Sequence, residues 1–337
     1  MAAEVSYRTR LLLNLFLVIA GVFLLILFFS DPTISGASVS GSVVVACNDT
    51  ITTSTSLSAN MDCTGNGINI GADNIVLNCK DYTIQGNNTA YGIYNFNYSG
   101  VTVKNCKIEN FSRGIYFKNT PGYAIYDNIL SNNNDGIYLT LYDFCINLYG
   151  SDSIVIGDFE VYDNSINSTN YGIYFDANSW GYNVYDNSVC EIGNIVINNN
   201  IINSSSDGIY LDEISEFGDK MYNSSSLTIG DFTVNNNNII SGSDGIYVGG
   251  IYDFGSYMYD NSLFAMGSIE FNDNIINSDS SGIYIGDGPY DFGYNMYGSS
   301  SFAMGSIEFN NNNITSGSDG IYLYGIYYIG YEMYGNS

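Results

Sequence analysis

Tyrosine side chains recur at one position of a repeating pattern, and they are the most regular set in the sequence that could bind a ligand. They stand 36 to 38 residues apart at Tyr138, Tyr174, Tyr210, Tyr247, Tyr284 and Tyr322, after two earlier members at Tyr94 and Tyr116. Aromatic rings stack against the apolar faces of sugars, and nearby Asn and Asp side chains would bond sugar hydroxyls. The pattern predicts a candidate polysaccharide-binding face. Two alternatives stay open: the rings simply cover a β-sheet, or inserted segments fold across them.

Catalytic and metal-binding residues are scarce by comparison. The chain has no His, which excludes nucleophilic triads that use it, and no C-x-x-C pair suggests zinc or redox chemistry. Paired carboxylates such as Glu270 and Glu308 would still suffice for an inverting glycoside hydrolase. A column of methionines that includes Met221, Met258 and Met296 favours apolar packing over soft-metal binding. We therefore assign no catalytic residues, no metal ligands and no cofactor.

The elements that position the tyrosines follow from the tripeptide Gly-Ile-Tyr. It begins at Gly92, Gly114, Gly136, Gly172, Gly208, Gly245, Gly282 and Gly320. A repeat of this size predicts a solenoid, in which each unit buries its apolar side against its neighbours. Side chains alternate along a strand, so the Ile after each glycine points into the core and the Tyr points outward. A second strand alternates in the same way, with Ile269 and Phe271 on either side of Glu270.

Two further columns predict how the repeat units, or rungs, stack. One stands where a strand meets a turn and consists of Cys79, Cys106, Asn128, Asn164, Asn200, Asn238, Asn274 and Asn313. Stacked asparagine amides would bond each other along the solenoid and satisfy a tight inner corner. The second column lies within inserts of the later rungs. After Gly136 the spacing between successive Gly-Ile-Tyr glycines rises from 22 to 36–38 residues, so each rung gains an insert of 14 to 16 residues. Apolar columns within the inserts predict either additional parallel strands or a β-lobe along one side.

The first thirty residues predict a helix that is a membrane anchor or a cleaved signal. Arg8 and Arg10 precede the run from Leu11 to Phe29, in which Asn14 is the only polar residue. Such a run is long enough to span one membrane core, and a small-residue cleavage site follows it. Under either alternative the arginines place the rest of the chain outside the cytoplasm. We expect a protein on the extracellular side of the cell membrane, or a secreted one if the leader is cleaved.

The cysteines and the first strands carry a family resemblance. In order stand Cys47, Thr50-Ile51-Thr52, Cys63-Thr64-Gly65, Ile68-Asn69-Ile70, Leu77-Asn78-Cys79 and then the Gly-Ile-Tyr rungs. This order resembles the right-handed parallel β-helix repeat proteins of archaeal and bacterial surfaces. The same broad group contains carbohydrate-binding proteins, sugar hydrolases and the periplasmic copper-maturation proteins of nitrous oxide reductase. The resemblance runs from Cys47 to the end and implies an all-β, right-handed parallel β-helix, without specifying one function.

Disulfides are permitted in an exported chain, and its six cysteines allow several pairings. Cys79 and Cys106 fill successive slots of the ladder column, as either small buried thiols or a disulfide. We favour the pairs Cys47 with Cys63 and Cys79 with Cys106. Cys145 and Cys190 occupy non-equivalent repeat positions and stay unassigned.

The domain division that follows is a leader at 1–30, a spacer at 31–46, a cap with short rungs at 47–135, and long rungs at 136–337. The last rung lacks one of its expected strands, and no polar cap follows it. We therefore expect either a truncated sequence or self-association through the C-terminal rung.

Composition limits the partners. Thirty-four acidic residues stand against eight basic ones, which makes nucleic acid an unsuitable ligand. Several Asn-X-Ser/Thr sites would suit a surface glycoprotein. Three functions stay open: a non-catalytic surface module that binds polysaccharide or envelope components, a polysaccharide lyase or glycosidase, and a self-assembling envelope or stalk element. The aromatic columns and the shortage of catalytic residues favour the first.

Overall fold

The computed structural model describes residues 44–325 and 327–335. The described part of the chain consists of strands, turns and bends, and it contains no helix that is long and apolar enough to cross a membrane. The anchor or signal helix expected between residues 11 and 29 lies outside the described residues.

The strands lie in three long parallel sheets and two smaller ones. Sheet A has ten strands: β1 (Asp49–Ile51), β4 (Ile68–Ile70), β7 (Tyr91–Phe96), β10 (Arg113–Lys118), β13 (Asp135–Tyr142), β17 (Ile173–Asn178), β21 (Ile209–Ser215), β25 (Ile246–Tyr252), β29 (Ile283–Tyr290) and β34 (Ile321–Leu323). Sheet B has nine: β2 (Thr55–Ser56), β5 (Val76–Asn78), β8 (Val101–Lys104), β11 (Tyr123–Tyr126), β15 (Phe159–Tyr162), β19 (Ile195–Asn198), β23 (Phe232–Thr233), β27 (Ile269–Glu270) and β32 (Ile307–Glu308). Sheet C has nine: β3 (Met61–Asp62), β6 (Thr83–Gln85), β9 (Lys107–Glu109), β12 (Ile129–Asn133), β16 (Ser165–Ser168), β20 (Ile201–Ser204), β24 (Asn238–Ser241), β28 (Ile275–Ser278) and β33 (Asn313–Ser316).

The two smaller sheets are formed by the inserts of the long rungs. The larger of them, which we call the insert sheet, has five strands: β14 (Ser153–Ile156), β18 (Val189–Ile192), β22 (Ser226–Ile229), β26 (Leu263–Met266) and β31 (Ser301–Met304). The last sheet pairs β30 (Tyr297–Gly298) with β35 (Tyr334–Gly335).

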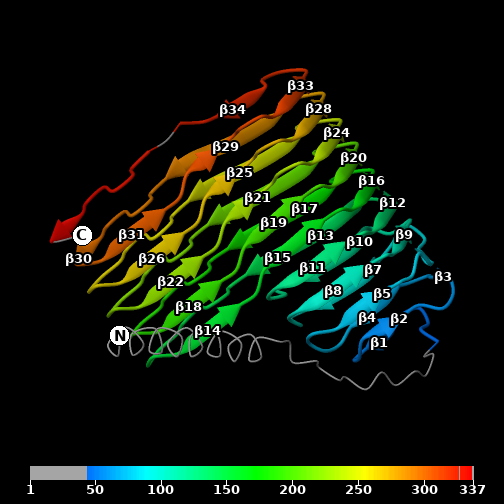
Figure 1. Cartoon of the computed structure of the whole chain (residues 1–337), viewed down its shortest axis with the longest axis horizontal. Coiled ribbons are helices and arrows are strands. Elements are labelled where there is room, and N and C mark those ends of the chain that lie inside the picture. Colours follow the sequence, from blue (N-terminus) through cyan, green and yellow to red (C-terminus); the bar gives the residue numbers. More distant parts are fainter. Residues whose placement is uncertain (1–43, 326, 336–337) are drawn as a thin grey trace, which may run out of the picture. The chain divides into compact units, whose positions relative to one another are not determined.

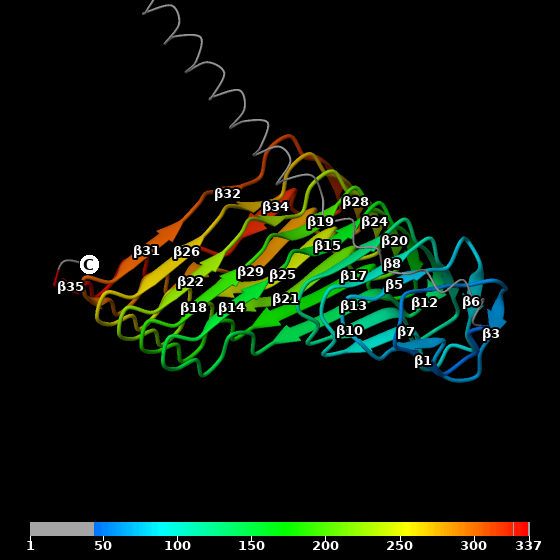
Figure 2. The same cartoon turned by 60° about the horizontal axis from the view of Figure 1, so that its bottom comes forward.

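The chain visits the sheets in a fixed order, and each visit adds a strand next to the equivalent strand of the preceding rung. Early rungs run from sheet A to sheet B to sheet C, and from β13 onward they pass through the insert sheet between A and B. Figures 1 and 2 show equivalent strands lying side by side along the stack. All named strand pairs are parallel, and connections between parallel strands are almost always right-handed. The fold is a right-handed parallel β-helix, as expected from the sequence.

Glycine starts each Gly-Ile-Tyr strand because successive rungs approach closely there. A Cβ on Gly208 would lie 2.2 Å from Ile239 Cγ2 and 2.5 Å from the Gly245 carbonyl oxygen, so a larger residue would force the rungs apart. The isoleucine that follows each glycine is buried at seven of the eight sites, with Ile321 in the last described rung as the exposed one. The predicted alternation is therefore correct. Asn95, a buried polar residue at an inward position of β7, is satisfied locally, because its amide donates to the Tyr98 carbonyl oxygen at 2.9 Å.

The asparagine ladder exists, but two of its members differ from the prediction. It consists of Asn128, Asn164, Asn200, Asn237, Asn274 and Asn312. In each of the first five, the main-chain N–H and the side-chain Nδ2 both donate to Oδ1 of the next asparagine in the ladder. The expected Asn238 and Asn313 instead begin β24 and β33 and are exposed.

The reason for the difference is the turn that precedes each ladder position. A residue with a left-handed backbone comes directly before each ladder asparagine, at φ of 57° for Asn199, 58° for Asn236 and 56° for Asn311. Asn and Asp adopt this conformation more readily than most residues. In a run of consecutive asparagines this turn geometry, rather than residue type, decides which member points inward.

The inserts form additional parallel strands, which resolves the two alternatives left by the sequence. Their aromatic column stacks in the core, with ring centroids 4.8 Å apart for Trp180 and Phe217 and 5.1 Å apart for Phe217 and Phe254. Met221, Met258 and Met296 pair in turn beside them and are at most 1 % exposed. The long rungs thus widen the apolar core of the β-helix beneath the insert sheet, and we call this extension the insert core.

Three disulfides cross-link the first half of the β-helix. They join Cys47 to Cys63, Cys79 to Cys106, and Cys145 to Cys190, with Cα atoms 5.5, 4.6 and 6.1 Å apart. The first two are the pairs favoured from the sequence. The third connects the insert of the first long rung to strand β18 of the next rung.

Candidate functional site

The tyrosine row lies on the outer face of sheet A, one side chain per rung. It consists of Tyr94, Tyr116, Tyr138, Tyr174, Tyr210, Tyr247, Tyr284 and Tyr322, which are paired in register across neighbouring strands. Tyr174 is buried and the others are half-buried. All six tyrosines that the sequence singled out as ligand-binding candidates, from Tyr138 to Tyr322, therefore share one continuous surface.

The rings of this row stack on each other. From Tyr138 to Tyr322 successive centroids are between 4.1 and 5.4 Å apart, and successive planes lie within 9° of parallel. Both faces of an interior ring are then occupied by its neighbours. Sugar rings therefore cannot stack on those faces, although stacking was the binding mode considered from the sequence. The row presents ring edges and hydroxyls outward instead. Any ligand would have to bind through hydrogen bonds and edge contacts.

One end of the stack is covered by the Arg113 side chain. Its guanidinium carbon lies 3.5 Å from the centroid of the Tyr138 ring and 4.4 Å from that of Tyr116, which is a favourable cation–π geometry. The guanidinium Nε also lies 3.6 Å from Asp135 Oδ2. Arg113 therefore occupies the free face of the first stacked ring.

Two carboxylates satisfy the hydroxyls in the middle of the row. Tyr174 donates to Asp212 at 2.6 Å and lies 3.4 Å from Asp176, while Tyr142 donates to Asp176 and Tyr210 to Asp212. Burial raises the pKa of Asp176 to about 6, and the negative charge of Asp212 acts in the same direction. Burial and the bond to Asp212 also raise the pKa of Tyr174 well above its usual value. This part of the row is thus an internally bonded network.

The next part of the row has no such acceptors. After Asp176 and Asp212, the same outward position is glycine in β25 and β29, at Gly249 and Gly286. Within the described residues, the hydroxyls of Tyr247, Tyr284 and Tyr322 have no hydrogen-bond partner. We call these three side chains the free hydroxyl row. Each phenol can both donate and accept a hydrogen bond, so this is where the sheet can offer bonds to a ligand.

The other candidates from the sequence have structural partners. Glu270 and Glu308 are neighbours in register on β27 and β32, and each accepts from an asparagine amide, Asn235 at 3.1 Å and Asn310 at 2.9 Å. The methionine column is packed in the insert core. No group of three or more Asp, Glu, His or Cys side chains in the described ranges is arranged to hold a metal ion.

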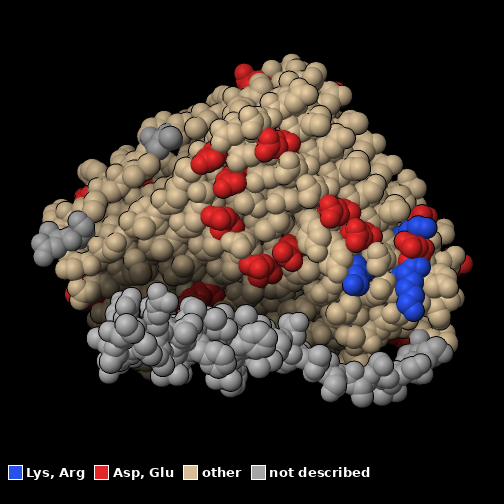
Figure 3. Space-filling model, viewed as in Figure 1, with Lys and Arg blue, Asp and Glu red and all other residues tan. Residues whose placement is uncertain are grey.

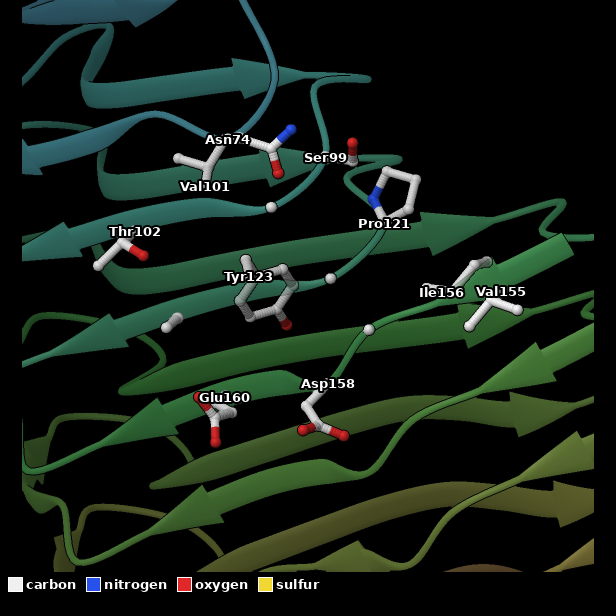
Figure 4. Close-up of a pocket in the computed structure, with 14 residues that line it drawn as sticks. Asn74, Ser99, Val101, Thr102, Pro121, Tyr123, Val155, Ile156, Asp158 and Glu160 are labelled. Carbon is white, nitrogen blue, oxygen red and sulfur yellow. The ribbon is translucent and has the colours of Figure 1, made fainter. Parts of the chain in front are cut away.

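Sequence reasoning missed a cleft where the short rungs meet the first long rung. It has a volume of about 430 Å³ and lies between the turns before β8 and β11 and the end of β14 (Figure 4). Tyr123, which is 4 % exposed, forms part of its wall, and Asp158 and Glu160 border it. The rise in repeat length at Gly136 was the available signal, because a wider rung must leave a step beside a narrower one.

Charge is distributed unevenly over the surface. On the face shown in Figure 3, acidic side chains are spread across the β-helix, whereas the basic side chains gather near the first rungs. The formal net charge of the chain is −26. This field favours neutral or basic ligands over anionic ones.

Comparison with known proteins supports the fold. Residues 34–191 match the family model described as "Periplasmic copper-binding protein (NosD)". No curated protein and no solved structure gives a significant match. The family match covers the cap, the short rungs and the first long rungs, and the parallel stacking of the strands continues beyond it. The chain is a right-handed parallel β-helix repeat protein that is similar, over residues 34–191, to the NosD family.

Proposed function

We propose that the protein is an exported, non-catalytic β-helix module that binds a polysaccharide along the tyrosine row. Three features support export: the apolar leader behind two arginines, the periplasmic location named for the matched family, and three disulfides, which persist in oxidising compartments. Retention at the membrane through residues 11–29 belongs to the same proposal.

The free hydroxyl row is the observation that carries the binding proposal. Its three phenols repeat at one per rung, with ring centroids 5.3 and 5.0 Å apart, on a rigid scaffold. A polysaccharide also repeats hydroxyl groups along its length, so one polysaccharide molecule can form hydrogen bonds with several phenols at once. Because the phenols are already held in place, binding does not have to order a flexible site. Because the protein is strongly acidic, the ligand that fits is a neutral or basic polysaccharide, not a polyuronate.

Copper, which the description of the matched family names, does not fit the donors of this chain. There is no His, and all six Cys are in disulfides, so thioethers are the remaining soft ligands. Met221, Met258 and Met296 lie in the insert core beside stacked aromatic rings and are at most 1 % exposed. Met61 and Met266 are also buried, Met304 packs against the core, and Met333 is the one exposed methionine among the described residues. We therefore derive no function from copper.

The experiment is a glycan array with the full chain, followed by titration of the best neutral polysaccharide. The variant Y247F/Y284F/Y322F removes three hydroxyls and keeps the stacked rings. The matched control is Y185F/Y222F/Y259F, which removes three hydroxyls from the tyrosine stack that borders the insert sheet. We expect affinity to fall by about tenfold or more in the first variant only, since each lost bond contributes roughly 1 kcal/mol. Absence of any bound glycan, or equal loss in both variants, would refute the proposal.

A second candidate function, hydrolysis of the bound polysaccharide, is favoured by the Asp176 and Asp212 pair. A carboxyl with a raised pKa beside a second carboxylate is the arrangement that glycosidases use. Asp176 is only 6 % exposed, however, and its partners are tyrosine hydroxyls, so substrate contact is limited. Release of reducing ends by the wild type, and its loss in D176N, would favour hydrolysis over binding alone.

A further inference from the structure

Strand β14 begins the insert sheet and has one paired edge. It pairs with β18, and among the described strands none lies on its other side. The Asp152 and Ile156 carbonyl oxygens accept from Val189 N at 2.8 Å and Gly193 N at 2.9 Å. Because the peptide groups of alternate residues point to opposite sides of a strand, Ser153 and Val155 direct their N–H and C=O groups away from β18. These groups form a short, free parallel edge.

The cleft adjoins this edge. Val155 and Ile156 lie on the long-rung side of the cleft and Pro121 on the opposite side, as Figure 4 shows, and Gly157 and Gly122 also line it. Val155 is 72 % exposed, which is unusual for a valine in a strand. An extended segment laid along β14 would therefore find backbone partners and an apolar contact in the same place.

The charge of the cleft indicates what kind of segment fits. Of its fourteen lining residues, Asp158 and Glu160 are acidic and none is Lys or Arg. Asp158 uses Oδ1 to accept from Asn194 N at 2.7 Å, which leaves Oδ2 for a ligand. Burial, and then the nearby Asp158 carboxylate, raise the pKa of Glu160, so a cation placed between them would relieve an unfavourable pairing. A second copy of this acidic chain would bring like charges together instead.

We propose that the free edge of β14 and the adjoining cleft dock an extended, basic peptide segment of another protein. The segment adds a strand to the insert sheet through Ser153 and Val155. One Lys or Arg side chain of the segment reaches Asp158 and Glu160, and an apolar side chain packs on Val155. This surface is separate from the tyrosine row, so the inference does not depend on polysaccharide binding.

The test begins with a phage-displayed library of random octapeptides selected against the full chain. Selected peptides are synthesised, and their affinity for the full chain is measured by fluorescence anisotropy. The decisive variant is Val155→Pro, which removes the free N–H at the edge. It spares the pairing with β18, because the Val155 N–H points away from that strand. Val155→Thr is the matched control, since it keeps the N–H and the β-branched shape.

We expect the selected peptides to carry Lys or Arg next to β-branched residues. Their affinity should fall about tenfold or more in Val155→Pro and stay within about twofold in Val155→Thr. In D158N/E160Q the preference for basic peptides over their Glu-substituted counterparts should disappear. The proposal is overturned if no peptide is enriched, if the enriched peptides are neutral or acidic, if binding survives Val155→Pro, or if cross-linking at Val155 joins two copies of this chain. Circular dichroism of each variant establishes that the β-helix is intact.

Discussion

The two adjacent asparagines at the start of β24 offer a sharp test of the ladder. Asn237 is 1 % exposed; its Oδ1 accepts from the main-chain and side-chain nitrogens of Asn200, and its amide donates to the Ile197 carbonyl oxygen at 2.8 Å. Asn238 is exposed, and its register partners on the neighbouring strands are Ile201 and Ile275. The same Asn→Ala change at these two positions should have very different costs.

The magnitude follows from the groups left without partners. In Asn237→Ala the buried Asn200 main-chain N–H and the Ile197 carbonyl oxygen each lose a partner. The Asn200 side-chain amide, by contrast, keeps the carbonyl oxygens of Val161 and Asn198. An unsatisfied buried group costs about 1 to 3 kcal/mol, so the two groups together predict a loss of about 2 to 6 kcal/mol in the free energy of unfolding. Asn238→Ala should change it by less than about 0.5 kcal/mol.

The assay is urea unfolding of the full chain followed by circular dichroism, together with hydrogen exchange of the Asn200 amide. Rungs of a solenoid interact mainly with their neighbours, so a local loss can appear as an early transition, and the exchange rate reports it directly. Faster exchange at Asn200 is expected in Asn237→Ala alone. Equal destabilisation by the two variants, or a larger effect of Asn238→Ala, would refute the ladder as described.

Three other outcomes follow from the structure. Ile246→Asp places a charge among buried apolar side chains and should cost more than about 3 kcal/mol, whereas Glu270→Gln should cost less than about 0.5 kcal/mol; thermal unfolding that responded equally would mean that the inward and outward faces are exchanged. Replacing Cys145 and Cys190 by Ser opens a 45-residue loop and should lower the free energy of unfolding by about 2 to 4 kcal/mol, measured as a lower urea midpoint without reducing agent; an unchanged midpoint would contradict a stabilising role of this disulfide. Burial raises the pKa of Asp176 from 3.8 to about 6, so between these pH values the folded chain binds more protons than the unfolded chain. The free energy of unfolding should therefore fall as pH rises through this window. Asp176→Asn should flatten this pH dependence, and an unchanged or steeper dependence would contradict the pKa assignment.

The fold could be predicted because its main determinants are local and periodic. Eight rungs start with Gly-Ile-Tyr, and this tripeptide indicates both how the rungs stack and which side chains point inward. Ile246, which is buried, and Tyr247, which is half-buried on the outer face, illustrate this. The insert columns likewise indicated that the inserts stack on each other, since apolar residues that recur at each rung must bury against each other, but they did not distinguish additional parallel strands from a β-lobe. A single strand of this length would leave open which of its residues face inward, but eight equivalent strands show the same apolar positions.

The site was harder to predict because it depends on geometry that residue type does not carry. Choosing between Asn237 and Asn238 required the left-handed turn at Asn236, which an Asn-rich stretch conceals. The Cys145–Cys190 disulfide joins positions that are not equivalent in the repeat, so the period gave no reason to pair them. The orientation of the tyrosine rings, on which the mode of ligand binding depends, is set by the rung spacing and was not visible in the alternation.

The polysaccharide proposal can be tested most directly by mapping where the ligand contacts the protein. Hydroxyl-radical footprinting of the full chain, read by mass spectrometry with and without the best ligand from the array, reports the protection of individual tyrosines. We predict protection of Tyr247, Tyr284 and Tyr322, and none at Tyr185, Tyr222 and Tyr259. Protection confined to the second group, or unchanged labelling of both groups at saturating ligand, would contradict the proposal.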